Sequence, residues 1–312
     1  GAFYESTPAM TTHGWDVASV NGTFGAAAAA AKLLKLNPTQ VKMVFSMAAS
    51  GACGFIQQTG SSTHYLEFGI VARHGVEAAE LIKAGFTAQE DIFWRPRTYG
   101  HAFCGEGGYD FSKLSKNLGN PYKITGVNIK KYSCCFRTHR AIDATLQLMK
   151  ENKLRYEDIA GVDVDMNQYD ADLLRYPVPE SGQQSRFSMP HTVASAILGE
   201  VTVKCFTDDF VNSPKVKEAR GKVNARLRTD WSPERFAART PVTIKTKDGR
   251  SFTKELDFPV QPSKEQFLAR HRQCCEMVFK PAQVEEFTSA MQHLEDVEDL
   301  ESVMKLVRGK ID

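Results

Sequence analysis

The chain has 312 residues, of which 42% are hydrophobic and 24% are charged. It carries 39 Lys and Arg against 37 Asp and Glu, a net charge of +2. This composition excludes a disordered chain and gives no sign of a nucleic-acid-binding surface. A chain of this length can bury a substantial core and has room for two domains.

The most apolar segment, residues 26–36, is alanine-rich and contains two lysines. It falls short of the roughly 18 uninterrupted apolar residues that a membrane-spanning helix needs. The first twelve residues lack a basic stretch followed by an apolar one, so they do not resemble a secretory signal. We therefore expect a soluble, cytoplasmic protein that does not bind membranes.

Seven cysteines include two adjacent pairs, Cys134–Cys135 and Cys274–Cys275. Adjacent cysteines do not reach the usual disulfide geometry with each other, so reduced thiols are expected. No cysteine or histidine spacing is typical of a zinc site, and the sequence predicts no metal site.

The first part of the chain reads as helical. Residues 23–36 are rich in alanine, the best helix former, and this helix should end at Asn37–Pro38. Residues 38–50 and 68–84 carry apolar positions at helical spacing, and Gly85 is suited to end the second of these helices. Many small residues here favour close packing of the helices.

The pattern changes after about residue 120, where alternating apolar residues predict strands. The expected strands are residues 123–132, 161–167, 222–228, 242–246 and 251–258. Asp248–Gly249 between the last two is a strong hairpin signal. Helices are expected between them at residues 140–151, 189–198 and 214–220.

From Ser263 onward the pattern is helical again, with amphipathic runs at residues 285–294 and 297–307. We therefore predict an α+β protein. Its helical domain would be built from residues 1–122 and 263–312, with a smaller α+β domain inserted at residues 123–262.

Three polar clusters interrupt these apolar segments. His13, in a loop before the alanine-rich helix, could present its imidazole to a substrate acid. A histidine that caps the helix or lies in solvent is the alternative.

The second cluster is residues 60–64. Gly60 to His64 form a Gly/Ser-rich loop at the start of a helix, where N–H groups and hydroxyls are suited to hold a carboxylate. A plain surface loop is the alternative.

The third cluster, residues 130–139, contains Lys130, Lys131, Cys134, Cys135 and His139. Neighbouring residues of a strand point to opposite faces, so one of the two lysines can face a cleft while the other stays in solvent. A lysine in a cleft can bind an acid or transfer a proton. The cysteines could serve thiol catalysis or, alternatively, act as small buried hydrophobic residues.

Together, these clusters resemble motifs of the MmgE/PrpD family, in the order in which that family has them. The similar segments are His13–Gly14–Trp15 with the alanine-rich helix, Gly60 to Gly75, Lys130 to Ala144, and Phe187 to Ala194. The resemblance implies a large helical domain with an inserted α+β lid. It also implies an active site in which His13, His64 and Lys130 surround the substrate carboxylates.

The resemblance therefore predicts a lyase or isomerase for small di- or tricarboxylic acids that uses neither metal nor organic cofactor. His13 would be the general acid or base and Lys130 would bind or protonate the substrate, while His64 and Thr63 would orient a second carboxylate. We also assign Cys135 and His139, from the same segment as Lys130, to substrate binding.

Two departures from the family pattern bear on this prediction. His64 stands where the family has lysine, and a histidine is only partly charged at neutral pH. The family also has more than a hundred residues before the His13 loop. We expect that segment to come from a homodimer partner or a second polypeptide; a processed fragment of a longer protein is the alternative. The rival functional interpretation is a non-catalytic or partner-dependent subunit.

Overall fold

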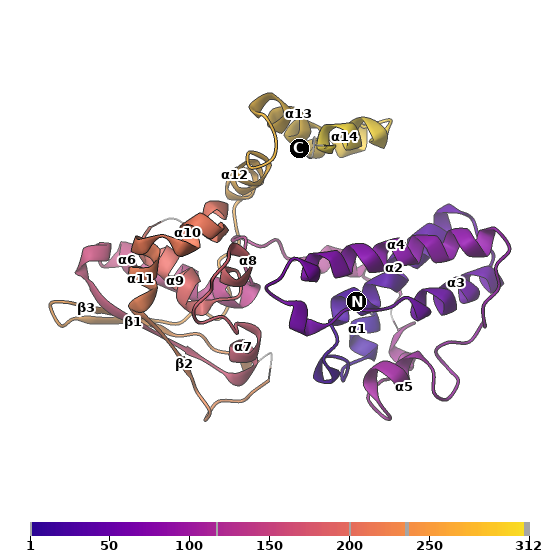
Figure 1. Cartoon of the computed structure of the whole chain (residues 1–312), viewed down its shortest axis with the longest axis horizontal. Coiled ribbons are helices and arrows are strands. Elements are labelled where there is room, and N and C mark those ends of the chain that lie inside the picture. Colours follow the sequence, from indigo (N-terminus) through magenta and orange to yellow (C-terminus); the bar gives the residue numbers. More distant parts are fainter. Residues whose placement is uncertain (1, 117, 200, 235–236, 309–312) are drawn as a thin grey trace. The chain divides into compact units, whose positions relative to one another are not determined.

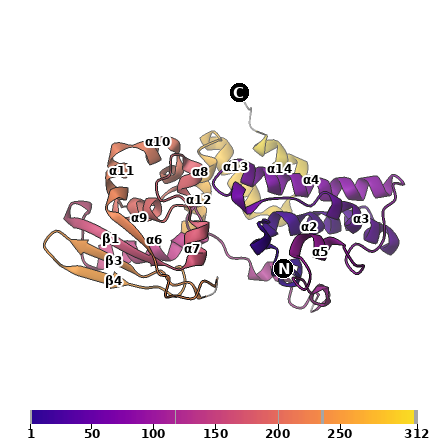
Figure 2. The ribbon, with the colours of Figure 1, turned by 60° about the horizontal axis from the view of Figure 1, so that its bottom comes forward.

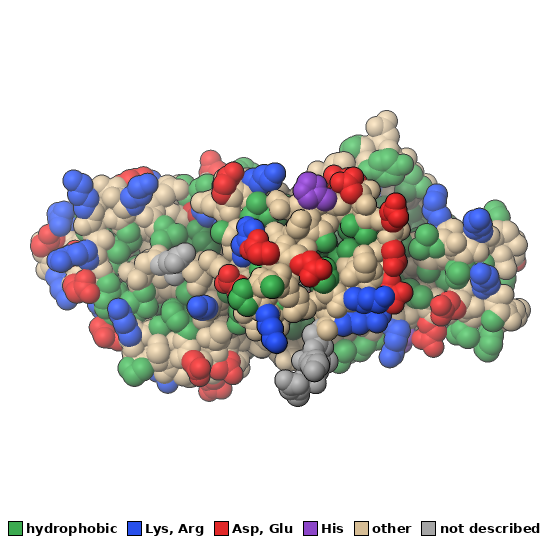
Figure 3. Space-filling view, turned by 90° about the horizontal axis from the view of Figure 1, so that it is seen from above, with side chains coloured by type: hydrophobic (Ala, Val, Ile, Leu, Met, Phe, Trp, Pro, Cys, Tyr) green, Lys and Arg blue, Asp and Glu red, His purple; other side chains and the backbone are tan. Residues whose placement is uncertain are grey.

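The computed structural model describes residues 2–116, 118–199, 201–234 and 237–308. The chain forms two compact units, Gly1–Val127 and Asn128–Asp312. Within the described residues, every helix is too short or too polar to cross a membrane. Acidic and basic side chains are interspersed on the face drawn in Figure 3, as the small net charge suggests.

The first unit is helical, as predicted. Its helices are α1 (Ala2–Ser6), α2 (Val17–Leu33), α3 (Pro38–Ser50), α4 (Thr63–Lys83) and α5 (Tyr99–Cys104). The long helices α2, α3 and α4 pack side by side (Figure 1). Their shared core is mostly alanine with Val44 and Ile82. Gly75 shows how close α4 and α2 are, because a Cβ there would lie 2.5 Å from the Thr23 carbonyl oxygen.

Helix boundaries in this unit follow from capping. Helix α3 has the predicted bounds, with Asn37 and Gln40 forming a capping box around Pro38. Helix α2 begins six residues before the predicted start because Asp16 accepts hydrogen bonds from the Ala18 and Ser19 N–H groups. Helix α4 begins at Thr63, five residues before the predicted start.

The second unit contains a four-stranded mixed sheet. Its strands are β1 (Ile159–Met166), β2 (Val223–Leu227), β3 (Val242–Thr246) and β4 (Ser251–Lys254), in the order β2-β1-β3-β4. Strand β1 is parallel to β2 and antiparallel to β3, and β3 and β4 form the predicted hairpin. On the polar face, Asp163 and Asp165 of β1 both bind Arg226.

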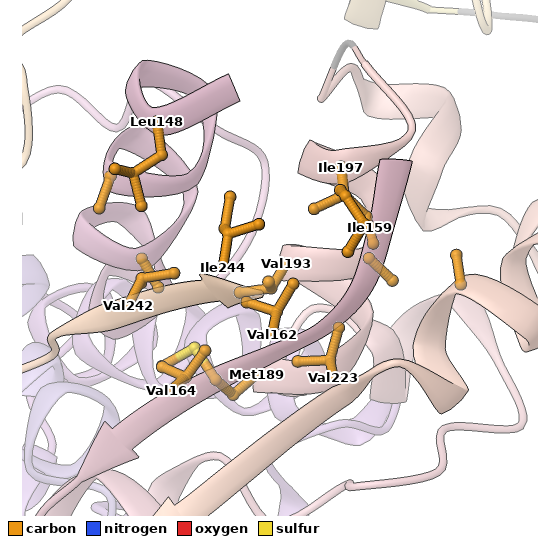
Figure 4. Packing of buried hydrophobic residues seen from close by; sticks show 14 of the residues in the cluster. Leu148, Ile159, Val162, Val164, Met189, Val193, Ile197, Val223, Val242 and Ile244 are labelled. Atoms are coloured by element: carbon orange, nitrogen blue, oxygen red, sulfur yellow. The ribbon is translucent and has the colours of Figure 1, made fainter. Parts of the chain in front are cut away.

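Helices cover the other face of the sheet (Figure 2). They include α6 (His139–Glu151), α9 (Met189–Ile197) and α11 (Pro214–Gly221), close to the predicted bounds. In Figure 4, Leu148 of α6, Val162 of β1, Val193 of α9 and Ile244 of β3 meet in the core between sheet and helices. This alternation of apolar and polar strand residues is what made the sheet predictable.

The remaining helices are α7 (Gln168–Leu173), α8 (Gly182–Ser185), α10 (Asp208–Asn212), α12 (Lys264–Cys275), α13 (Pro281–Gln292) and α14 (Leu300–Val307). Ser263 and Gln266 form the capping box at the start of α12. The last three helices fall in the second unit, and their assignment to the helical domain stays a prediction.

One expected strand is wrong. Residues 123–132 begin with a 3₁₀ helix, Lys123–Gly126, and continue without a strand. Their end is held instead by side chains, since Lys131 and Tyr132 both bind Asp143 of α6. The boundary between the units lies between Val127 and Asn128, within this segment and five residues after the predicted position.

Candidate functional site

Asp143 fixes the segment that carries Lys130. This carboxylate is 2% exposed and accepts hydrogen bonds from Lys131 Nζ at 2.7 Å, the Tyr132 hydroxyl at 2.8 Å and the Val260 N–H at 2.8 Å. Lys131 therefore forms a structural ion pair with Asp143. Lys130 precedes it, is exposed and lines a cavity of about 760 Å³ within the second unit.

Basic side chains gather around this cavity. Besides Lys130, its lining includes Arg137, Arg140 and Arg239. Arg137 lies in the 3₁₀ turn Phe136–Thr138 that leads into α6, and Arg140 follows three residues later in the first turn of α6. Sequence reasoning placed these arginines in the segment but gave them no role. Their spacing of three residues could have indicated that both arginines lie on the same side of the chain.

The three arginines are already paired with protein groups. Arg137 binds Asp170, and Arg140 donates a hydrogen bond to the Ala238 carbonyl at 2.7 Å and lies 3.8 Å from Asp170. Arg239 binds Glu255 in bidentate fashion, at 2.8 and 2.6 Å. Lys130, in contrast, has no carboxylate within 4.0 Å in the part of the chain that the structure describes. Lys130 can therefore bind an anion in the cavity without first breaking an ion pair.

The electrostatic attraction between the Lys130 ammonium and a carboxylate would contribute measurably to the binding of a small acid. A carboxylate 4 Å from its ammonium would gain about 4 kcal/mol at an effective dielectric constant of about 20, and about 1 kcal/mol in bulk water. The paired arginines add hydrogen-bond donors around the cavity. The arrangement is suited to hold an acid with more than one carboxylate.

Cys135 lines the cavity, and His139 does not. Burial raises the pKa of the Cys135 thiol, and burial raises that of Cys134 to about 12. Both are therefore thiols at neutral pH, which favours the interpretation as small hydrophobic residues over thiolate nucleophiles.

His139 is fully buried, and its ring lies 5.2 Å from the rings of Tyr132 and Phe136. Burial, with a smaller effect of Lys130, lowers the pKa of His139 to about 4. The imidazole is therefore neutral and belongs to the core beneath the segment that carries Lys130. The assignment of His139 to substrate binding stays a prediction.

In the first unit, the His13 loop is joined to residues 54–56. The Asp16 N–H donates to the Gly54 carbonyl and the Ile56 N–H donates to the Gly14 carbonyl, both at 3.0 Å. The ring of Trp15 stacks on Phe55 with a centroid distance of 4.8 Å. Gly54 has φ +131°, and a Cβ there would lie 1.9 Å from the Ser19 hydroxyl, so only glycine fits.

This pairing brings the loop of His13 to the start of helix α4. Asp16 Oδ2 lies 3.6 Å from His64 Nδ1, and Glu67 Oε2 lies 3.9 Å from the same nitrogen. Glu67 also accepts a hydrogen bond from the Phe55 N–H at 2.8 Å. Sequence reasoning found His64 but missed both carboxylates. Glu67 could have been found, because it lies three residues after His64 on the same side of the helix.

The two carboxylates repel each other. One oxygen of Asp16 lies within 4.8 Å of one oxygen of Glu67, and two unit charges at that distance repel by about 3 kcal/mol at an effective dielectric constant of about 20. A positive charge between them would offset this repulsion.

His13 and Thr63 are both exposed. The His13 ring lies beside Gly105, 3.3 Å from where a Cβ of that residue would be. His13, Thr63 and His64 thus belong to the first unit, whereas Lys130, Cys135 and His139 belong to the second.

A helical unit and a helix-covered mixed sheet agree with the fold that the sequence resemblance implies. Residues 4–112 match the MmgE/PrpD N-terminal domain and residues 132–296 match the MmgE/PrpD C-terminal domain. The chain therefore belongs to the MmgE/PrpD family.

Curated relatives include two proteins named cis-aconitate decarboxylase. The mouse protein is 26% identical over 301 residues and the human protein 25% identical over 303 residues. Each alignment covers 93% of this chain and 62% of the relative. A cis-aconitate decarboxylase-like protein of Aspergillus oryzae is 26% identical over 162 residues, which are 49% of this chain and 32% of that protein. The chain thus spans about three-fifths of the length of the mammalian relatives.

Proposed function

We propose that this chain is a lyase or isomerase that acts on a small di- or tricarboxylic acid by proton transfer at the carbon next to a carboxylate. Dehydration, decarboxylation and epimerisation all fit this description. The observation that carries the proposal is Lys130, an exposed lysine that lines a cavity beside three arginines and has no carboxylate partner among the described residues.

The chemistry follows from where charge develops. When a base removes a proton from the carbon next to a carboxylate, the electron pair moves onto the carboxylate oxygens. A lysine ammonium beside those oxygens stabilises this charge more than the charge of the starting acid. Lys130 is proposed for this role. After proton removal, loss of hydroxide from the neighbouring carbon completes a dehydration, and reprotonation on the other face completes an epimerisation. In a decarboxylation the electron pair comes instead from the C–C bond that breaks as CO2 leaves, and the carbon takes up a proton from the general acid.

The first unit is proposed to supply the proton-transferring group. His13 is exposed and can exchange protons with a substrate, and an imidazole is suited to do so near neutral pH. His64, with Thr63 in the same helical turn, is proposed to orient a second carboxylate. The names of the mammalian relatives support a carboxylic acid as the substrate class.

Turnover tests this proposal directly. The purified chain is incubated with cis-aconitate, 2-methylcitrate and related acids, and products are followed by NMR. We expect turnover of at least one acid, a loss of at least about a hundredfold in kcat/KM for Lys130→Met and for His13→Gln, and no change for Lys150→Met. Lys150 is an exposed lysine of α6 that does not line the cavity.

If no acid is turned over and none binds, the lyase proposal is wrong. That result would favour the non-catalytic or partner-dependent alternative. Turnover that survives Lys130→Met would instead remove the cavity in the second unit from the mechanism.

A further inference from the structure

We propose that Asp16, His64 and Glu67 form a binding site for a divalent transition-metal ion in the first unit. The spacing of these residues along the chain does not indicate a metal site, because Asp16 lies 48 positions before His64. The fold brings them together when the His13 loop pairs with residues 54–56. This site stands on the first unit alone and does not depend on the proposed lyase activity.

One oxygen of each carboxylate accepts hydrogen bonds from backbone N–H groups, and the other oxygen lies near the His64 imidazole. Asp16 Oδ1 accepts hydrogen bonds from the Ala18 and Ser19 N–H groups at 2.9 and 3.1 Å. Glu67 Oε1 accepts from the Phe55 N–H at 2.8 Å. These bonds fix both side chains, as outer hydrogen bonds fix the carboxylate ligands of metal sites.

The free oxygens and the imidazole have separations that suit one ion. Asp16 Oδ2 and Glu67 Oε2 lie 3.6 and 3.9 Å from His64 Nδ1. One ligand atom from each of the three residues lies within 4.8 Å of the other two. Ligands that bind one ion at about 2.0–2.2 Å are themselves about 3 to 4 Å apart. Small side-chain rotations would therefore complete the coordination.

Burial gives the second reason. Asp16 and Glu67 are each 6% exposed, and Glu67 Oε2 accepts no hydrogen bond from the residues that the structure describes. A buried carboxylate oxygen without a donor is costly unless a cation binds it. A divalent ion would neutralise both carboxylates at once.

The donor set indicates the class of ion. Carboxylate oxygens suit Mn²⁺, imidazole suits Zn²⁺ and Fe²⁺, and a mixed set favours such ions over Mg²⁺ or Ca²⁺, which prefer oxygen alone. Three protein ligands leave at least one position for water or another oxygen ligand.

Metal binding is tested without any substrate. The full chain is stripped with EDTA and titrated with Mn²⁺, and bound ion is measured by EPR, with Zn²⁺ added to displace it. We expect one Mn²⁺ per chain, displaced by Zn²⁺. Asp16→Asn and Glu67→Gln should weaken binding at least about tenfold, because each keeps an oxygen for its backbone N–H groups but loses the charge.

The control is Asp110→Asn. Asp110 likewise caps a helical turn, accepting from the Ser112 N–H at 3.1 Å, but it lies outside the cluster and should leave binding unchanged. Circular dichroism of each metal-free variant shows that the fold persists. The proposal is overturned if the wild-type chain binds no stoichiometric Mn²⁺, or if folded Asp16→Asn and Glu67→Gln chains bind it as tightly as the control. A chain that binds Mn²⁺ but turns over no acid would contradict only the lyase proposal.

Discussion

Two neighbouring lysines of the second unit should respond in opposite ways to the same substitution. Lys131 pairs with a buried carboxylate, whereas Lys130 lines the cavity without an acidic partner among the described residues. We predict that Lys131→Met destabilises the protein and that Lys130→Met does not. The second substitution should instead weaken the binding of a carboxylic acid.

The size of the Lys131 effect follows from its partner. Breaking a buried ion pair costs about 3–5 kcal/mol when the remaining charge is left alone. Asp143 would keep two donors, Tyr132 and the Val260 N–H, and Lys131 is 18% exposed. We therefore expect a loss of about 2–3 kcal/mol in the free energy of unfolding. In a domain of 150–250 residues this lowers the Tm by about 4–12 °C.

Lys130→Met removes an exposed side chain that pairs with no carboxylate among the described residues, so its effect on the free energy of unfolding should stay within about 0.5 kcal/mol. Differential scanning calorimetry measures stability, and isothermal titration with citrate measures binding. The reasoning is refuted if the two variants have equal Tm values, or if Lys130→Met loses several degrees while binding citrate like the wild type.

Three further outcomes are expected. Gly54→Ala should lower the free energy of unfolding by more than about 2 kcal/mol in urea titrations, because its Cβ would overlap the Ser19 hydroxyl in a backbone conformation that glycine favours. The pKa of His139 is lowered from 6.5 to about 4, so between these pH values the unfolded chain binds a proton that the folded chain does not. Stability should therefore fall as the pH decreases from 6.5 to 4, and His139→Gln should make that dependence shallower. Iodoacetamide should modify the exposed Cys274 quickly and the buried Cys135 only on unfolding, as mass spectrometry of peptides would reveal.

Each of these has a contrary result. A Gly54→Ala chain as stable as the wild type would contradict the close packing of Gly54 against Ser19. An unchanged pH dependence in His139→Gln would mean that another group controls stability in that range. Labelling of Cys135 at the rate of Cys274 in the native chain would contradict its burial.

Most of the regular structure was predictable because local patterns agree with the final packing. Helix α3, the four strands and the Asp248–Gly249 hairpin were predicted from helical spacing, alternation and turn residues. The strand predicted at residues 123–132 does not form, because alternating apolar residues make a strand only where a neighbouring strand can pair with them. Side-chain bonds to Asp143 hold the end of that segment instead of a sheet ladder.

The candidate sites were only partly predictable. Lys130 and His64 lie in polar motifs that interrupt apolar segments, and that contrast can be read from the chain. Asp16 was given no role, because the predicted helix began at residue 23 and left Asp16 in the preceding loop. Its place beside His64 depends on backbone pairing between residues 14–16 and 54–56, which no local pattern encodes. The pairing of Arg239 with Glu255 at the cavity is likewise a product of the tertiary fold.

A crystal structure of the chain with bound citrate would test the role of Lys130 most directly. We predict a carboxylate group of citrate within hydrogen-bond distance of Lys130 Nζ, with Lys131 still bound to Asp143. Citrate bound elsewhere, with the Lys130 ammonium in solvent, would contradict the assignment of this lysine to the substrate.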